Sequence, residues 1–504
     1  MKATERARKP NILILMTDQQ RAEQHWPAGW VKKNLPSVAR LAKHGLTFNR
    51  AFTSAAECSP SRAALLTSTY PQQNGVTTTP GTLSPTGLKN MAQVMSDAGY
   101  AVAWKGKWHL AYSATATSPD FLAAYDANDW NPPDAGTSLQ VDSTLGGGTP
   151  NNDGRYVSGP DGEPGQTKGY GESVVEFLRG YDQSGPPFCL FVSLVNPHDV
   201  HVLMLDYEAW GYRADDFRHG GISLPENHDD NLTSKPAVQL QFRRNWHSFS
   251  RQQSLDYVNF YAYLHRVVDG HITKVLDTLD ELDLTDDTLV VRFSDHGEMG
   301  LSHGLCEKMY TAYDETIRVP LVFSNPVWFP KPVETDSFAT LIDLLPTLAR
   351  VAGARGVGGM GFRGKDLTPI LKDPHAAVQD GVLFTYDDPL LQTISGALHI
   401  RCLRKRDWMY AVYFDEAGTE FQYELYDLTA DPGQLTNLAY DAPVSAQWRR
   451  LHKELTKKVT GLGAAPAGFD WSKAAPRRWS NQPPVLTHLY SMPPERRKLV
   501  GGRG

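Results

Sequence analysis

The chain of 504 residues has few cysteines, no long apolar run and only a small net charge. Its four cysteines are Cys58, Cys189, Cys306 and Cys402, and their wide spacing does not fit a zinc site or a disulfide framework. This usage is typical of a reducing compartment. The apolar run ILILM near the N-terminus is too short for a signal-peptide core and far too short to span a membrane, so we expect a buried strand and a cytoplasmic protein.

The net charge of −6 gives no reason to expect nucleic-acid binding. This charge is uneven, because residues 441–504 carry twelve Lys or Arg and only four Asp or Glu. The hydrophobic fraction of 41% and the charged fraction of 21% are those of a globular protein. A chain of this length is expected to form more than one lobe.

Short apolar runs alternate with helical patterns over most of the chain, which predicts an α/β fold. The predicted strands are Asn11–Met16, Ala101–Ala103, Phe188–Leu194, Thr288–Phe293 and Pro320–Phe323. They are mostly continuous rather than alternating, as expected for strands that are covered on both faces. The clearest helix runs from about Ser254 to Leu282, with apolar residues at steps of three and four. We therefore expect a large, mainly parallel sheet with helices on both faces.

Three segments depart from the pattern of the body, which we place at residues 1–390. Residues 113–168 are rich in turn formers, so we expect an irregular insertion that is either a lid near the substrate entrance or a surface excursion. Residues 391–462 contain short apolar runs that predict a small antiparallel sheet. Residues 463–504 are rich in Pro, Arg and Trp. They predict an extended basic tail that packs either on a neighbouring subunit or on its own subunit.

Two pairs of polar residues stand just after predicted strands. MTDQ gives Asp18 and Gln19 after the first strand, and SDHG gives Asp295 and His296 after the strand near residue 291. Because ligands bind at the carboxyl ends of the strands in an open α/β sheet, these side chains can converge on one cation. Oxygen ligands favour Ca²⁺ or Mg²⁺ over zinc, and an imidazole would also tolerate Mn²⁺. Each aspartate taken alone fits a helix N-cap equally well.

The run CSPSRAALLT at residues 58–67 is the most informative motif. It resembles the signature of the type I sulfatases, in which the cysteine is oxidised after translation to formylglycine, an aldehyde that serves as the nucleophile. The matching positions are Cys58, Pro60, Ser61, Arg62, Leu66 and Thr67, and Ser68 stands where the family usually has glycine. The alternative for Cys58 is a buried cysteine at a helix start, acting as a small apolar residue.

Five further segments resemble motifs of this family and occur in the family's order. They are PNILILMTDQQ at the first strand, GKWHL at 106–110, NPHD at 196–199, SDHG at 294–297 and EKMYTAYDETIRVP at 307–320. His296 stands where many members have asparagine. Residues 425–439 also resemble the family's C-terminal element. The resemblance covers most of the chain and implies the alkaline-phosphatase-like fold.

The resemblance implies a role for each matching residue. The divalent metal, with Ca²⁺ as the expected ion, would be held by Asp18, Gln19, Asp295 and His296, and residue 58 would add an oxygen. The hydrated aldehyde would be steadied by Arg62, Lys107 and His109. The sulfate would be contacted by Lys107, Lys308 and His198, and His198 would protonate the leaving oxygen.

The implied activity is hydrolysis of sulfate monoesters. Two alternatives stay open. One is a phosphonate monoester or phosphodiester hydrolase of the same superfamily, since those relatives share the nucleophile, an Asp-Gln start and an Asp-His metal pair. The other is an inactive protein that binds sulfated ligands.

The implied partners are a sulfate ester, a formylglycine-generating enzyme during maturation, and further copies of the chain in a dimer or tetramer. We expect neither nucleic acid nor membrane as a partner. A bacterial cytoplasm is the expected location, because animal members of the family are typically secretory or lysosomal.

Overall fold

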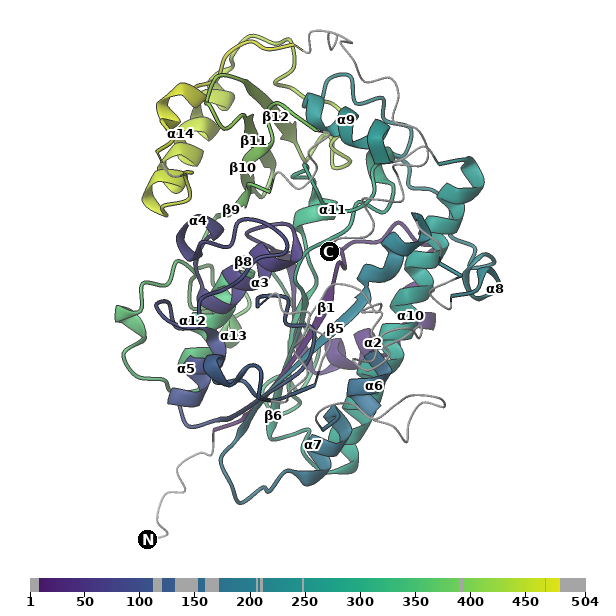
Figure 1. The fold of residues 1–504 in the computed structure, drawn as a ribbon, viewed down its shortest axis with the longest axis vertical. Helices are drawn as coiled ribbons and strands as arrows, with labels where there is room; N and C mark the ends of the chain where they lie inside the picture. Colours follow the sequence, from purple (N-terminus) through teal and green to yellow (C-terminus); the bar gives the residue numbers. More distant parts are fainter. Residues whose placement is uncertain are drawn as a thin grey trace.

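The protein is built on two β-sheets, one large and mainly parallel, the other small and antiparallel (Figure 1). The structure is a computed structural model that describes residues 9–111, 120–131, 153–158, 172–204, 207–208, 212–246, 249–388, 394–466 and 468–480. Among these residues, no helix is both long and apolar enough to cross a membrane.

The large sheet has eight strands within the described part of the chain. Their spatial order is β4 (Asn128–Asn131), β3 (Ala101–Gly106), β5 (Phe188–Pro197), β1 (Asn11–Asp18), β6 (Thr288–Ser294), β7 (Leu321–Ser324), β2 (Gly45–Phe52) and β8 (Val333–Thr340). Neighbouring strands run parallel except at β7, which pairs antiparallel with both β6 and β2. The five predicted strands are confirmed as β1, β3, β5, β6 and β7, so the predicted α/β architecture holds.

Helices cover both faces of the large sheet. Successive residues of a strand point to opposite sides, so each strand contributes side chains to the core on both faces. In β1, Ile12 and Ile14 enter the core on one side, and Leu13 and Leu15 enter the core on the other. The first side is covered by α3 (Cys58–Thr67), α5 (Met91–Asp97), α12 (Leu344–Val351) and α13 (Thr368–Lys372). The second side is covered by α2 (Pro36–Lys43), α6 (Asp153–Ser158), α7 (Val174–Gly180) and α10 (Arg251–Glu281) (Figure 1).

The long helix expected near Ser254–Leu282 is confirmed as α10. It follows Ser250, whose side chain accepts a hydrogen bond from the Gln253 amide at 3.3 Å and so satisfies a free N–H at the helix start. Val268, Ile272 and Val275 are buried against the sheet, as their spacing predicts.

Shorter helices connect these layers. The α-helices among them are α1 (Trp30–Asn34), α4 (Pro71–Asn74), α8 (Ala214–Phe217), α9 (Ala237–Trp246) and α11 (Asp314–Ile317). The 3₁₀ helices are η1 (Ala123–Tyr125), η2 (His198–Met204), η3 (Ser302–Gly304), η4 (Leu341–Asp343), η5 (Val357–Gly359) and η6 (Trp471–Ala474). Of these, η2 bears on the site, because it begins at His198 directly after β5.

The small sheet has the order β12 (Phe421–Asp427), β11 (Trp408–Phe414), β10 (His399–Lys405) and β9 (Gly381–Tyr386), all antiparallel. This confirms the expected C-terminal antiparallel sheet. Helix α14 (Ala446–Gly461) packs on it and buries Trp448 and Leu451. The boundaries that we expect at 390/391 and 462/463 stay predictions, and β9 lies before the first of them.

Two predicted features fall partly outside the described residues. Within the expected insertion at 113–168, the described stretches contain η1, β4 and α6, and its role as a lid stays a prediction. Within the expected tail, Trp471 and Trp479 are buried against α14 and the small sheet of their own chain. This part of the tail therefore packs on its own subunit. Residues 481–504 lie outside the described part.

Candidate active site

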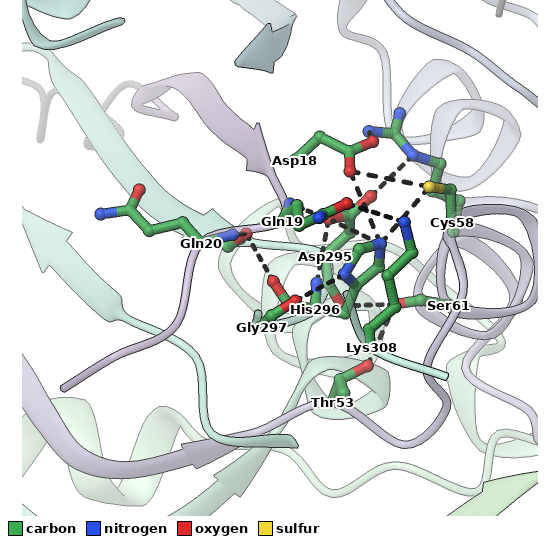
Figure 2. Close-up of polar contacts among 12 residues, drawn as sticks. Asp18, Gln19, Gln20, Thr53, Cys58, Ser61, Asp295, His296, Gly297 and Lys308 are labelled. Carbon is green, nitrogen blue, oxygen red and sulfur yellow. Dashed lines mark hydrogen bonds and ion pairs between the residues drawn. The ribbon is translucent and has the colours of Figure 1, made fainter. Parts of the chain in front are cut away.

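The site forms where β1, β6 and α3 meet at the carboxyl edge of the large sheet. Asp18 is the last residue of β1, Asp295 directly follows β6, and Cys58 is the first residue of α3. Adjacent positions in the sheet bring the ends of β1 and β6 together, with Thr17 paired to Ser294. The positions predicted to bind one cation are thus gathered at one point (Figure 2).

Four predicted metal residues form a compact, buried cluster. Ligand atoms of Asp18, Cys58, Asp295 and His296 all lie within 4.8 Å of one another. The Cys58 Sγ atom lies 3.4 Å from His296 Nε2 and 3.6 Å from Asp18 Oδ1. Two carboxylates and an imidazole at this separation are a donor set suited to a divalent cation.

The orientation of His296 tests whether a cation fits here. Its Nδ1 lies 3.0 Å from the carbonyl oxygen of Gly297, which can only accept, so a neutral ring carries its proton on Nδ1. Its Nε2 lone pair then faces Asp18 Oδ1 at 3.5 Å. In this tautomer Nε2 and Asp18 Oδ1 can both serve as ligands to one cation, so the residues fit a metal. The contact between Nδ1 of His296 and the Gly297 carbonyl is of the kind that orients histidine ligands in metal sites.

Gln19, the fifth predicted metal residue, lies beside the cluster. Its Oε1 accepts a hydrogen bond from Lys308 Nζ at 2.7 Å, and its Nε2 donates to Glu298 at 2.6 Å and to Glu307 at 3.2 Å. Its backbone N–H donates to Asp295 Oδ1 at 3.2 Å. Gln19 therefore links the Asp295 carboxylate to Lys308, and its role as a metal ligand stays a prediction.

Arg62 joins α3, the helix that begins at Cys58, to the carboxylates of Asp18 and Asp295. It lies one turn after Cys58 in α3, so both side chains project from the same face. Its Nε donates to Asp295 Oδ2 at 2.9 Å and its Nη2 donates to Asp18 Oδ2 at 3.0 Å. Its Nη1 donates to the carbonyl of Lys107 at 2.8 Å and to Ser193 Oγ at 2.9 Å. This planar fork fixes four partners with one buried charge.

Lys107 brings a second cation to the cluster. It follows β3, and its Nζ donates to Asp18 Oδ2. Burial would raise the pKa of Asp18, but the charges of Lys107 and Arg62 hold this pKa well below its usual range. Asp18 is therefore ionised at neutral pH.

His109, His198 and Lys308 complete the predicted set. The pKa values of His109 and His198 lie well below the usual range. Burial is the larger cause and the nearby charge of Lys107 is the second, so both rings are neutral in the free protein. Burial opposes the charge of Lys308, but Glu307 raises its pKa well above the usual range, so this lysine stays cationic. Lys308 Nζ donates to Gln19 Oε1 at 2.7 Å, beside the cluster.

Three acidic residues of the site were not predicted. Glu298 and Glu307 bracket the Gln19 amide, and burial together with the charge of Glu307 raises the pKa of Glu298 to about 7. Glu57 directly precedes Cys58 and has a φ of +70°, an uncommon conformation for a residue with a side chain. Burial raises the pKa of Glu57 to about 7. Their only sequence signal was a position within or beside a motif.

Burial also governs the unmodified cysteine. It raises the pKa of the Cys58 thiol to about 12, and the nearby charge of Asp18 acts in the same direction. A thiol in this state is a poor nucleophile at neutral pH.

Comparison with known proteins agrees with this geometry. The sulfatase family model matches residues 10–354, more than two thirds of the chain. The chain belongs to the sulfatase family. A second model, the C-terminal part of N-sulphoglucosamine sulphohydrolase, matches residues 301–461 of this sulfatase.

Individual relatives of this sulfatase are distant but match over nearly the whole chain. An uncharacterized sulfatase of Escherichia coli is 26% identical over 485 residues, covering 94% of this chain and 92% of the relative. A solved 2-O GAG sulfatase has a TM-score of 0.69 at 21% identity, covering 92% of this chain and 94% of the other. A phosphonate monoester hydrolase from Silicibacter pomeroyi has a TM-score of 0.68 at 22% identity, covering 91% and 97%. The fold is therefore alkaline-phosphatase-like, as expected.

Proposed function

We propose that this protein is a metal-dependent sulfuric ester hydrolase that uses formylglycine made from Cys58. The observation that carries the proposal is the position of Cys58. It stands at the first turn of α3, with Sγ 3.4 Å from His296 Nε2, in contact with the buried Asp18–Asp295–His296 cluster. A nucleophile oxygen at this position would lie between the metal ligands and the cations that face an anionic ester.

The metal would be held by Asp18, Asp295 and His296, with residue 58 and Gln19 as further ligands. When bound, it supplies positive charge that offsets the charge of the ester and of the nucleophile. Ca²⁺ is the proposed ion because carboxylate and amide oxygens prevail, and Mn²⁺ is the alternative that the imidazole of His296 favours. Activity of protein stripped of metal and reloaded with each ion separately tests this choice.

The chain's own residues divide the remaining tasks. Arg62 and Lys107 hold the nucleophile and the Asp18 carboxylate in place, and Lys107 and Lys308 face the sulfate oxygens on which charge develops. One hydroxyl of the hydrated aldehyde gives up its proton and attacks sulfur, the S–O bond to the alcohol breaks, and the alcohol leaves with a proton. The other hydroxyl then loses its proton, the C–O bond to the sulfate breaks, and sulfate and the aldehyde are released. Water adds to the aldehyde and restores the diol.

His198 is the proposed acid for the leaving oxygen. Burial and Lys107 keep it neutral in the free protein. A sulfate group bound between His198 and Lys107 would raise the pKa of His198, because its negative charge favours the imidazolium and so opposes the lowering by burial and by Lys107. Proton donation by His198 would therefore depend on bound substrate.

Substrate profiling tests the proposal. Metal-loaded protein, produced together with a formylglycine-generating enzyme, is assayed with an aryl sulfate, an alkyl sulfate, a phosphodiester and a phosphonate monoester. The proposal expects the highest kcat/KM on a sulfate ester. No turnover of any of the four would instead support an inactive protein that binds sulfated ligands.

Hydrolysis of phosphonate monoesters or phosphodiesters is the second candidate. The observation that favours it is the donor set, since Gln19 and His296 accompany the two aspartates at the cluster. The complete CSPSR motif and the match to the sulfatase family favour sulfate. A kcat/KM at least tenfold higher on the phosphonate ester would establish the second candidate.

The remaining proposals concern partners and location. We propose a homo-oligomer, a dimer or tetramer, in a bacterial cytoplasm, and maturation by a formylglycine-generating enzyme. Because Trp471 and Trp479 pack on their own chain, the proposed arm toward a second subunit is the part of the tail that follows them. Truncation after Ser480 followed by light scattering tests whether that arm holds the oligomer together.

A further inference from the structure

Helix α6 lies within the expected insertion, yet it packs against the large sheet and α10. Tyr156 and Val157 are fully buried in the core between the large sheet and α10. Its residues contact β3 and β5 close to the carboxyl ends of these strands. Those two strands lead into Lys107 and His198, which follow them directly.

The carboxylate of Asp153 accepts two backbone amides at the end of β5. Its Oδ1 accepts from the Val195 N–H at 2.7 Å, and its Oδ2 accepts from the Asn196 N–H at 3.0 Å. The pairing of β3 with β5 ends at Gly106 opposite Ser193. The amides of Val195 and Asn196 therefore lie beyond the last pair between β3 and β5, although β5 stays paired with β1 as far as Pro197. Asp153 accepts these two amides where β3 no longer does.

Asp153 is held without a cation among the described residues. It is fully buried, and its third partner is the hydroxyl of Tyr156, which donates to Oδ1. A buried carboxylate is costly unless its lone pairs are satisfied, and here hydrogen bonds alone satisfy them. The buried Asp153 carboxyl group therefore serves its hydrogen-bond partners rather than apolar packing.

Tyr156 extends the contact from β5 to β3. Its hydroxyl lies 3.1 Å from the carbonyl oxygen of Ser193. Its ring covers Gly106, where an added Cβ would lie 2.7 Å from the ring and 2.2 Å from the Ser193 carbonyl. The same Ser193 carbonyl accepts the N–H of Lys107 at 2.9 Å. Only glycine, at φ of +90°, allows this close approach just before Lys107.

We propose that Asp153 and Tyr156 are positioning residues that fix the ends of β3 and β5 and thereby set Lys107 and His198 against the sulfate. The inference rests on the proposed function, because it takes the roles of these two residues from it. Neither Asp153 nor Tyr156 touches the metal cluster or Cys58 in the contacts above, so their effect passes through the backbone.

The chain offers a matched control in Asp343. Its carboxylate is also fully buried and accepts the N–H groups of Thr340 at 2.8 Å and Lys365 at 2.6 Å, together with Gln379 Nε2 at 2.7 Å. Asp343 lies at the start of α12, and none of these three partners belongs to β3 or β5. Asp153→Asn and Asp343→Asn therefore replace the same kind of buried carboxyl group, each an acceptor of two backbone amides, at two different places.

The experiment compares both variants with the wild type in metal content, in the fraction of formylglycine and in kcat/KM for an alkyl and a nitrophenyl sulfate. For Asp153→Asn we expect unchanged metal and formylglycine. We also expect a loss of about 100-fold on the alkyl sulfate, since misplacement by about 1 Å costs that much. The loss on the nitrophenyl sulfate should be at least tenfold smaller, because its leaving group needs His198 least. Asp343→Asn should lower both rates equally or not at all.

Hydrogen exchange provides a readout that does not depend on activity. Peptides that cover residues 104–110 and 194–202 should lose amide protection together in Asp153→Asn, and in Tyr156→Phe to a smaller extent, and keep it in Asp343→Asn. Unchanged protection at both strand ends, or equal losses on the two sulfates, would overturn the inference while leaving the proposed function intact. A wild-type protein without sulfatase activity would overturn both.

Discussion

Removing the Asp295 carboxylate is the perturbation that separates a metal site from a structural ion pair. Its Oδ1 accepts N–H groups of Gln19 at 3.2 Å and His296 at 2.9 Å, and its Oδ2 accepts Arg62 Nε at 2.9 Å. Asp295→Ala deletes one of two carboxylates in the cluster and leaves Asp18 alone to offset the cation. We expect the metal to be lost, and activity with it.

The expected losses of metal affinity and of stability follow from general magnitudes and from the contacts of Asp295. Loss of a partner outside the ligand shell weakens metal binding by about 10–100-fold, so loss of a ligand should cost more than about 100-fold, or roughly 2.8 kcal/mol. Breaking a buried ion pair destabilises a protein by about 3–5 kcal/mol. We expect the lower end of that range, because Arg62 keeps its contact with Asp18 at 3.0 Å.

The assay measures bound metal, the midpoint of thermal unfolding and kcat/KM on an aryl sulfate. Asp387→Ala is the control, since the Asp387 side chain is only 8% exposed and pairs with Arg401 at 2.8 and 3.0 Å directly after β9. The control should lose stability and keep its metal and its rate. An Asp295→Ala variant with unchanged metal content and rate would refute the metal assignment.

Two further predictions concern the acid and a pH-dependent pair. His198→Ala should slow alkyl sulfates by about 10²–10⁴-fold and nitrophenyl sulfates much less, and equal losses would show that His198 only binds sulfate. Burial opposes ionisation of Asp387, but Arg401 lowers its pKa below the usual range, so its stabilising contribution is complete above about pH 4 and is lost as pH falls further. The difference in unfolding free energy between wild type and Asp387→Asn, measured by urea denaturation, should therefore shrink below about pH 4, and a difference that grows there would contradict the assignment.

The central strands of the fold could be predicted because they are apolar on both faces. β1, β5 and β6 are wholly buried, and such continuous runs stand out in the sequence. β8 was missed because it is an edge strand with exposed polar positions, in the sequence VETDSFAT. The antiparallel direction of β7 was also beyond the sequence, since strand direction depends on the path of the connections rather than on local pattern.

The residues of the site were predictable where motifs carry them. Asp18, Cys58 and Asp295 lie within recognisable segments, and the order of the sheet brings those segments together. Glu298 and Glu307 could not be assigned, because only the folded arrangement shows that both contact the Gln19 amide. Asp153 was hidden for a different reason, since it lies in a segment whose composition predicts irregular structure.

The mass of the peptide that contains residue 58, compared with the activity of the intact protein, tests the central claim most directly. Protein made with and without a formylglycine-generating enzyme is digested, and each preparation is assayed for sulfate hydrolysis. The account predicts a peptide roughly 18 Da lighter than the cysteine form after oxidation of the thiol to the aldehyde, with activity proportional to its fraction. Full activity in a preparation whose residue 58 is entirely unmodified cysteine would contradict it.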